Sequence, residues 1–266
     1  MPTHLDGFDR VVCINLDGRP DRWELVQAEV EPLLGSATLE RFSAVKPTLA
    51  KQPVHNGRAG CLLSHRGVIE QALRGGLDSV LVLEDDVRFA PACEGPLDAA
   101  LQALHTTDWG IFYLGFTPQA PLLPAGPGLV RTFGGTTTHA VAYHRRAMPA
   151  LLDRLPDERG VLRFLSRYKS LDRYYWQLLA PTLPCYAADP LLAFQRDDFS
   201  DIQQQGTASN ESEATHAFAR HLRSADTLPA RLRVNLGLAV NRVRYGADAL
   251  RRGWCRPIEP ASSTIA

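Results

Sequence analysis

Long apolar runs are missing from this sequence, and its first residues lack the pattern of a leader peptide. A membrane-spanning helix needs about 20 consecutive apolar residues, and no run of even about 18 occurs. The N-terminal stretch MPTHLDGFDRVV has neither the basic start nor the apolar centre of a secretory signal. We therefore expect a soluble, cytoplasmic protein.

Cysteine is scarce and has no paired spacing. The five cysteines are Cys13, Cys61, Cys93, Cys185 and Cys255, an odd number with no CxxC pair. This pattern argues against a disulfide framework and against a zinc site built on CxxC motifs. We expect reduced thiols, as found in a reducing compartment.

Net charge is absent as well, because 29 Lys and Arg balance 29 Asp and Glu, but the charges are unevenly distributed. Residues 228–266 contain seven arginines and only two acidic residues, so the rest of the chain is mildly acidic. This basic, helical C-terminal segment allows two interpretations: a peripheral contact with the inner membrane, or packing on its own domain. The second is favoured, because helices that carry arginine often pack in this way.

The first 115 residues alternate between short apolar strands and helices. The pattern predicts strands at 10–16, 38–45, 79–83 and 109–116, and helices at 20–34, 65–76 and 96–104. The stretch 47–59 contains Pro and Gly and is predicted to be a loop, after which Ser64 caps the second helix. Such alternation is typical of a parallel α/β sheet.

The pattern changes after residue 116. We expect a loop at 118–128, strands at 128–133 and 138–144, and helices at 146–155, 171–179 and 229–252. The polar stretch 197–214 is predicted to be a mobile loop or lid. The hydrophobic content of 45% suits one large α/β domain over 1–227, with halves that meet at residue 115, and a further segment at 228–266.

The most informative motif is SVLVLEDDVRF, in which an apolar strand ends in Glu84, Asp85 and Asp86. In open α/β sheets, ligands bind beyond the carboxyl ends of the strands. Carboxylates are hard ligands suited to Mg²⁺ or Mn²⁺, and such an ion would relieve their repulsion while binding a diphosphate. The alternative is that these residues cap the next turn or pair with Arg88.

Two further stretches offer groups suited to a phosphate. INLDGRPDRW places Asn15, Arg19 and Arg22 in the turn after the first strand, where forked guanidinium donors suit phosphate. GCLLSH places Ser64 and His65 at a predicted helix start, whose positive end attracts anions. Solvated charges and an ordinary N-cap are the structural alternatives for these two stretches.

Two later stretches offer hydroxyl, imidazole and carboxylate groups. GGTTTHAVAYH combines glycines that allow close backbone approach with Thr137 and with His139, which could bind phosphate or a metal. SLDRYYWQLL places Asp172 beside aromatic rings that could stack on a sugar, and its carboxylate could act as a general base. A turn into a strand and a capped amphipathic helix are the alternatives.

Six stretches of the sequence together resemble glycosyltransferase family 25, over roughly residues 10–205. In chain order they are INLDGRPDR, GCLLSH, LVLEDDV, FYLG, THAVAYH and SLDRYYW. That family includes bacterial lipopolysaccharide galactosyltransferases and collagen-modifying galactosyltransferases. The resemblance implies an α/β fold of the glycosyltransferase A type, with a Rossmann-like nucleotide-sugar-binding half at 1–115, a mixed sheet and an acceptor-side half at 116–227. It also implies an inverting transfer from a UDP-sugar, commonly UDP-galactose, assisted by Mn²⁺ or Mg²⁺.

The resemblance also implies roles for individual residues. Asp86 would be the main metal ligand and Glu84 a second one, with Glu84 or Asp85 reaching the ribose or a bound water. Asp172 is the first choice for the base that accepts the acceptor's proton, and Asp201 is the second. The residues that would bind the donor are Asn15, Leu16, Arg19, Arg22, Ser64, His65, Glu84, Asp85, Thr137 and His139.

The implied partners are a UDP-sugar and a glycan, glycolipid or protein acceptor, with no nucleic acid, in lipopolysaccharide or surface-glycan biosynthesis. Two stretches depart from the family pattern: HNGRAG lacks an acidic residue, and the loop PQAPLLPAGPG is individual to this chain.

Two other functions stay open. A metal-dependent phosphohydrolase or nuclease also needs an acidic cluster, although such enzymes often use two metals about 4 Å apart. The other is a non-catalytic UDP-sugar-binding protein of the same fold.

Overall fold

The computed structural model describes residues 4–176, 183–200 and 205–224. Asp201, the predicted helix at 229–252, the end of the predicted helix at 171–179 and the basic segment 228–266 lie outside the described residues. Within the described ranges, no helix combines the length and apolar character needed to cross a membrane.

Helices and strands alternate along most of the described chain. The helices are α1 (Pro20–Val30), α2 (Pro53–Arg74), α3 (Glu94–Leu104), α4 (Met148–Arg154), α5 (Val161–Tyr168), α6 (Leu171–Tyr174) and α7 (Glu211–Ser224), with 3-10 turns η1 (His4–Gly7) and η2 (Glu31–Leu33). The strands are β1 (Val11–Asn15), β2 (Leu39–Ser43), β3 (Ser79–Glu84), β4 (Val87–Phe89), β5 (Ile111–Pro118), β6 (Leu123–Gly126), β7 (Leu129–Thr132), β8 (Gly135–His144), β9 (Cys185–Ala188), β10 (Ala193–Gln195), β11 (Asp198–Ser200) and β12 (Gln205–Thr207).

The centre of the molecule is an eight-stranded sheet with the order β2-β1-β3-β8-β5-β9-β7-β6. β1 pairs in parallel with both β2 and β3, as the sequence predicts for the first part of the chain. β8 comes from the second half of the chain and lies antiparallel between β3 and β5. The predicted α/β fold with a mixed sheet is confirmed.

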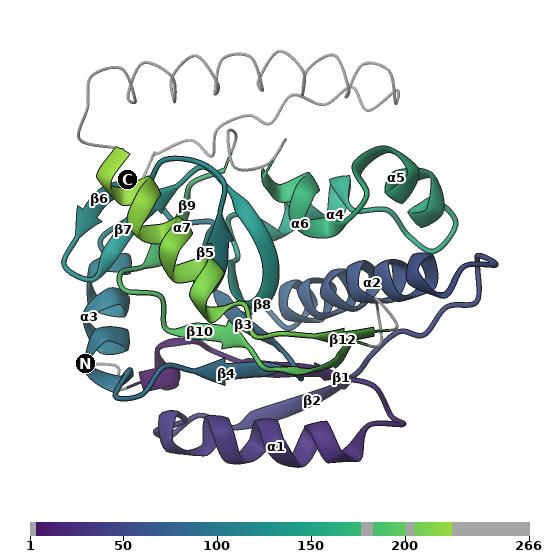
Figure 1. Ribbon diagram of the computed structural model, residues 1–266, viewed down its shortest axis with the longest axis horizontal. Coiled ribbons are helices and arrows are strands. Elements are labelled where there is room, and N and C mark those ends of the chain that lie inside the picture. The colour runs from purple at the N-terminus through teal and green to yellow at the C-terminus, as the bar shows by residue number, and fades with distance from the viewer. Residues whose placement is uncertain (1–3, 177–182, 201–204, 225–266) are drawn as a thin grey trace.

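Apolar side chains cover both faces of the sheet. Along β3, Val80 and Val82 point to the face covered by α2, whereas Leu81 and Leu83 point to the opposite face, which α1 and α3 cover. Figure 1 shows α1 and α2 on opposite sides of β1 and β2. Burial on both faces explains why β3 reads as a continuous apolar run in the sequence.

The start of α2 differs from the prediction. The helix begins at Pro53, so the predicted loop over 47–59 is wrong in its last part, and Ser64 is not an N-cap. Ser64 lies in the middle of the helix, where its hydroxyl donates to the carbonyl of Gly60 (2.7 Å) and accepts the Val45 N–H (2.8 Å). Gly60 has a packing role, because a Cβ at this residue would overlap the carbonyl oxygen of Val45.

The second half of the chain agrees with the prediction in some elements and differs in others. The predicted strands at 128–133 and 138–144 and the helix at 146–155 correspond to β7, β8 and α4. The stretch 197–214, predicted as a mobile loop, contains the β11–β12 hairpin and the beginning of α7. Helix α5 is not predicted, although its buried residues Val161, Phe164, Leu165 and Tyr168 have helical spacing.

The described cysteines Cys13, Cys61, Cys93 and Cys185 are all free thiols, as predicted. Three of them are buried, and Cys61 is half-buried on α2. Burial is the main cause that raises the thiol pKa of each of the four. They are therefore protonated at neutral pH unless a cation displaces the proton.

Gly115 gives the first testable prediction, because β5 and β10 approach closely at this residue. A Cβ there would overlap the carbonyl oxygen of Ala193 and lie 2.5 Å from Nε2 of His139. β5 cannot move aside easily, since it pairs with β8 on one side and β9 on the other. We expect Gly115→Ala to lower the free energy of unfolding by about 3 kcal/mol, measured by urea denaturation.

The control for this substitution is Gly95→Ala. Gly95 lies in the first turn of α3, and a Cβ built there has no neighbour within 4 Å. Alanine is the better helix former, so stability should change there by no more than about 1 kcal/mol. Equal losses in the two variants would contradict the close approach of β5 and β10.

Candidate active site

The acidic cluster lies where β3 ends and the chain turns into β4. Residues 79–83 of β3 are buried, and the alternation of the strand places Glu84 on the same face as Val80 and Val82, beneath α2. Asp85 and Asp86 follow in a turn of two residues. The three carboxylates therefore lie in different surroundings although they are adjacent in sequence.

Asp85 is held by the end of β1 and by α1. Its carboxylate accepts hydrogen bonds from Nδ2 of Asn15 (2.7 Å) and from the guanidinium of Arg22 (2.8 Å). Burial raises its pKa, and Arg22 and Asn15 oppose this shift. Asn15 is fully buried and also accepts a hydrogen bond from Nε of Arg41 (2.8 Å). Asp85 thus fixes β1, β2 and α1 at one edge of the site.

Glu84 faces α2 and β8. Its Oε1 accepts the hydroxyl of Thr138 (2.8 Å) and lies 3.4 Å from Nε2 of His65 and 4.0 Å from Sγ of Cys61. Burial opposes its ionisation, but His65 and Thr138 outweigh that effect and hold its pKa below the ordinary value. Glu84 is therefore a carboxylate at neutral pH.

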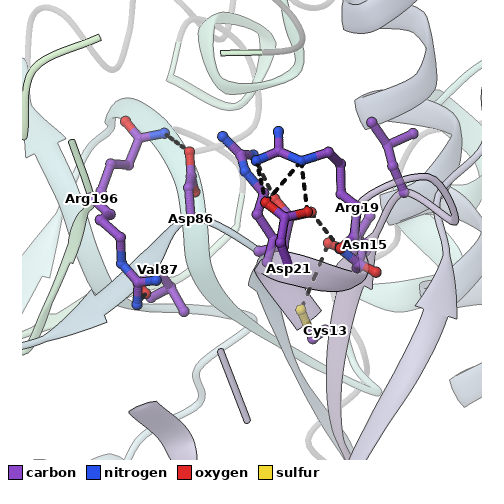
Figure 2. A network of polar contacts seen from close by, with 12 residues as sticks. Cys13, Asn15, Arg19, Asp21, Asp86, Val87 and Arg196 are labelled. Atoms are coloured by element: carbon purple, nitrogen blue, oxygen red, sulfur yellow. Dashed lines mark hydrogen bonds and ion pairs between the residues drawn. The ribbon is translucent and has the colours of Figure 1, made fainter. Parts of the chain in front are cut away.

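Asp86 is the carboxylate that the protein satisfies least. Its Oδ2 accepts a hydrogen bond from Nε2 of Gln195 (3.3 Å), whereas its buried Oδ1 has no hydrogen-bond partner among the described residues. Burial raises its pKa to about 7, and the charges of Glu84 and Asp85 add to the shift. Figure 2 shows Asp86 together with the neighbouring contacts of Asn15, Arg19 and Asp21. A partnerless oxygen among like charges fits a bound divalent cation.

A cavity of about 420 Å³ opens beside the three carboxylates. Its other walls are the end of β1, residues 44–48 after β2, and the first half of α2. Its volume is that of a pocket for a small ligand. The predicted site residues that line it are Leu16, Arg22, Ser64, His65, Glu84, Asp85 and Asp86.

Sequence reasoning missed Lys46, Thr48 and Asn56 on this cavity wall. Lys46 and Thr48 follow directly after β2, which lies beside β1, so the rule that ligands bind beyond strand ends could have found them. Asn56 is on α2, in the part predicted as a loop. Carboxylates, an arginine and a lysine in one cavity suit an anionic ligand that is bound partly through a cation.

Four of the predicted donor-binding residues lie away from the cavity wall. Asn15 is buried behind Asp85, and Arg19 forms an ion pair with Asp21 (2.8 Å). His139 is fully buried with Nε2 3.2 Å from the carbonyl of Ala193, and burial lowers its pKa, so it is neutral. Thr137 is also outside the cavity lining. Donor binding by these four residues stays a prediction.

Asp172 lies in the first turn of α6 and bonds to the start of β8. Its Oδ2 accepts the backbone N–H of Thr137 (3.0 Å), and its Oδ1 accepts the hydroxyl of Ser170 and the N–H of Arg173 (2.8 Å). Thr137 has φ +72°, a strained conformation for threonine, and its buried hydroxyl has no partner among the described residues. Asp172 therefore stabilises β8 next to Thr138, whose hydroxyl donates to Glu84. Its role as a base stays a prediction, and Asp201 lies outside the described residues.

Comparisons with known proteins agree with the motifs. Residues 42–115 match the model of glycosyltransferase family 25, described as an LPS biosynthesis protein. Human inactive glycosyltransferase 25 family member 3 is 28% identical over 217 residues, which are 70% of this chain and 36% of the relative. Mouse procollagen galactosyltransferase 2 is 28% identical over 138 residues, 43% of this chain and 22% of the relative. The predicted resemblance to the family is confirmed.

The matched part of the chain spans only 36% of the human relative and 22% of the mouse relative. Among solved structures, a glycosyltransferase involved in the glycosylation of the major capsid of PBCV-1 is similar, with a TM-score of 0.45 and 11% identity. That likeness covers 73% of this chain and 95% of the other one.

Proposed function

We propose that this chain, which carries a glycosyltransferase family 25 segment at residues 42–115 and has homologues in that family, transfers a sugar from a UDP-sugar to a hydroxyl group. The sugar we propose is galactose, and the acceptor is a glycan, glycolipid or protein. The observation that carries the proposal is Asp86, whose buried Oδ1 has no hydrogen-bond partner among the described residues and which lines a cavity together with Arg22 and Lys46.

Asp86, with Glu84 beside it, would hold Mn²⁺ or Mg²⁺. When bound, such an ion supplies positive charge that stabilises the leaving diphosphate. Arg22 and Lys46 add positive charge to the same cavity and suit the phosphates of the donor. Because Arg22 is paired with Asp85, its guanidinium is held in place before the donor arrives.

Inversion at the sugar carbon requires a base that takes the acceptor's proton from the face opposite the leaving group. We propose Asp172 for this role because its carboxylate lies next to β8, whose Thr138 contacts Glu84. The proton would move to a carboxylate oxygen of Asp172, which three hydrogen bonds hold in position. Thr137, also in β8, carries a buried hydroxyl without a partner among the described residues, and we propose that it contacts a sugar.

We further propose that the protein acts in the cytoplasm, in lipopolysaccharide or surface-glycan biosynthesis. The basic segment 228–266 could add a peripheral contact with the inner membrane, and its sequence is the support for this role. A second function, a UDP-sugar-binding protein without turnover, is favoured by one specific observation. A human relative that aligns with 70% of this chain carries the word "inactive" in its name.

Titration calorimetry and a donor-hydrolysis assay test the proposed function. We expect UDP-galactose to give a binding heat that requires Mn²⁺, and to be hydrolysed slowly to UDP in the absence of an acceptor. UDP-glucose and UDP-N-acetylglucosamine, tested in parallel, should bind more weakly. Lys46→Ala should weaken donor binding about tenfold, as expected for one lost charged contact.

The control is Lys51→Ala, which removes an exposed lysine that does not line the cavity. Donor binding without any turnover would favour the non-catalytic function. An absence of heat with every UDP-sugar, together with cleavage of a phosphodiester, would overturn the transferase and favour a phosphohydrolase or nuclease.

A further inference from the structure

A second group of metal-ligating side chains lies in the wall of the cavity, next to Asp86. Cys61, His65 and Glu84 each offer one ligand atom, and these atoms all lie within 4.8 Å of one another. We propose that the three residues form a separate cation site, which binds Zn²⁺ or a cation of similar softness. Zinc binding at this cluster does not require that the chain transfer a sugar.

The positions of the three residues follow from the fold. Cys61 and His65 are four residues apart on α2, so their side chains share one face of the helix. That face lies over the end of β3, where the alternation of the strand turns Glu84 towards the helix. Helix α2 and strand β3 thus bring together a thiol, an imidazole and a carboxylate.

The distances between the ligand atoms are close to those of a tetrahedral zinc site. Bond lengths of about 2.0–2.3 Å to N, O and S place neighbouring ligand atoms about 3.3–3.7 Å apart. Nε2 of His65 lies 3.4 Å from Oε1 of Glu84, and Sγ of Cys61 lies 4.0 Å from the same oxygen. The third pair, the thiol of Cys61 and the imidazole of His65, has its ligand atoms within 4.8 Å of each other.

The groups behind the ligands are arranged as they are in zinc sites. Nδ1 of His65 lies 3.0 Å from the hydroxyl of Tyr143, which also accepts a hydrogen bond from Tyr175 (3.2 Å). If Nδ1 carries the proton and donates it to Tyr143, the lone pair of Nε2 faces Glu84. Thr138 donates to Glu84 at 2.8 Å. Such outer contacts orient the ligands and strengthen metal binding.

Access and ligand type distinguish this site from the one at Asp86. All three ligands line the cavity of about 420 Å³, so a fourth position is open to water or to a small ligand. Thiolate and imidazole favour Zn²⁺ over Mg²⁺, whereas Asp86 offers only hard oxygen atoms. Glu84 belongs to both groups, so a zinc ion here would compete with a harder ion for that carboxylate.

Metal binding by the full-length chain tests the proposal directly. After removal of metals with a chelator, the protein is equilibrated with Zn²⁺ in excess Mg²⁺, and bound zinc is quantified. Replacement by Co²⁺ then reports thiolate coordination through a charge-transfer absorption band. We expect about one Zn²⁺ per chain and a clear Co²⁺–thiolate band, and we expect Cys61→Ser to abolish the band and weaken zinc binding at least about tenfold.

The matched control is Cys93→Ser, because Cys93 is a buried thiol at the start of α3 and does not line the cavity. Both variants carry Cys255→Ala, which removes the cysteine outside the described residues. Glu84→Gln should keep the Co²⁺ band and lower zinc affinity, which gives a second readout if the serine variant folds poorly. Failure of the unaltered chain to bind zinc, or equal bands in the Cys61 and Cys93 variants, would overturn the site.

Discussion

Replacing Asp86 with Asn should lower sugar transfer about 10³-fold while the protein stays folded. The variant keeps the shape of the side chain but removes the charge from a buried oxygen that has no partner among the described residues. Removing one group that stabilises developing charge commonly costs 10²–10³ in kcat, and loss of a charged metal ligand lies at the upper end of that range. Initial rates of UDP release with and without Mn²⁺ measure the effect, and Asp86→Ala should behave in the same way.

Asp153→Asn is the control for the loss of one negative charge, because Asp153 is an exposed residue of α4 that does not line the cavity. It should leave the rate within about twofold of the unaltered protein, as expected for a surface change. Unchanged turnover in Asp86→Asn would remove Asp86 from the metal site and with it the main support for the proposed mechanism.

The same variant has an expected effect on stability that depends on pH. Burial, Glu84 and Asp85 raise the pKa of Asp86 from 3.8 to about 7 in the folded protein. Between these two values the folded state binds more protons than the unfolded state, so this group's contribution to stability falls as the pH rises from about 4 to 7. In metal-free buffer, Asp86→Asn should therefore unfold at a higher temperature than the unaltered protein at pH 8, and this gain should shrink towards pH 4.

Asp172→Asn has the second large expected effect, a fall in kcat of about 10³-fold with donor affinity unchanged, because general-base catalysis contributes 10²–10⁴. Asparagine retains an oxygen that can accept the N–H of Thr137, which lies 3.0 Å from Asp172, so the conformation of β8 at this residue should persist. It cannot accept the acceptor's proton. In a plot of kcat against pH, the variant should lack the part of the curve that depends on the protonation of the base.

Asp157→Asn is a matched control, because Asp157 also accepts backbone N–H groups, from Arg159 and Gly160 at 3.1 Å, just before α5. It should leave kcat unaffected. If Asp172→Asn changes KM but keeps both kcat and the pH profile, Asp172 is a positioning residue for β8. The base would then be sought elsewhere, with Asp201 as the next candidate.

The parts of the fold that could be predicted are those where one local pattern dominates. The strands β1 and β3 are mostly apolar runs that are buried except at Glu84, and their residues read as strands without any tertiary information. The first part of α2 was missed because Pro and Gly usually indicate a loop. Here Pro53 starts the helix, and Gly60 allows α2 to pack against the backbone at Val45. Such contacts between distant segments leave no local signal.

The candidate site could be predicted in its chemistry but not in its detailed geometry. The acidic cluster marked the end of β3, yet its three members proved to have different partners: Arg22 for Asp85, His65 for Glu84 and Gln195 for Asp86. These pairings depend on which face of the sheet each side chain reaches. The spacing of Cys61 and His65 was visible in the sequence, but Glu84 joins them only through the packing of α2 on β3.

The position of β8 has a consequence for how this chain could be inherited or transplanted. β3 and the first five residues of β5 lie within residues 42–115, the segment that matches the family model, but the two strands are not neighbours in the sheet. β8, at Gly135–His144, lies between them and also supplies the hydroxyl that contacts Glu84. A gene fragment encoding 42–115 would therefore carry the acidic motif without β8, the strand that lies between β3 and β5. We therefore expect an exchange of residues 42–115 between homologues to preserve the surroundings of Glu84 only when residues 135–144 are exchanged with them.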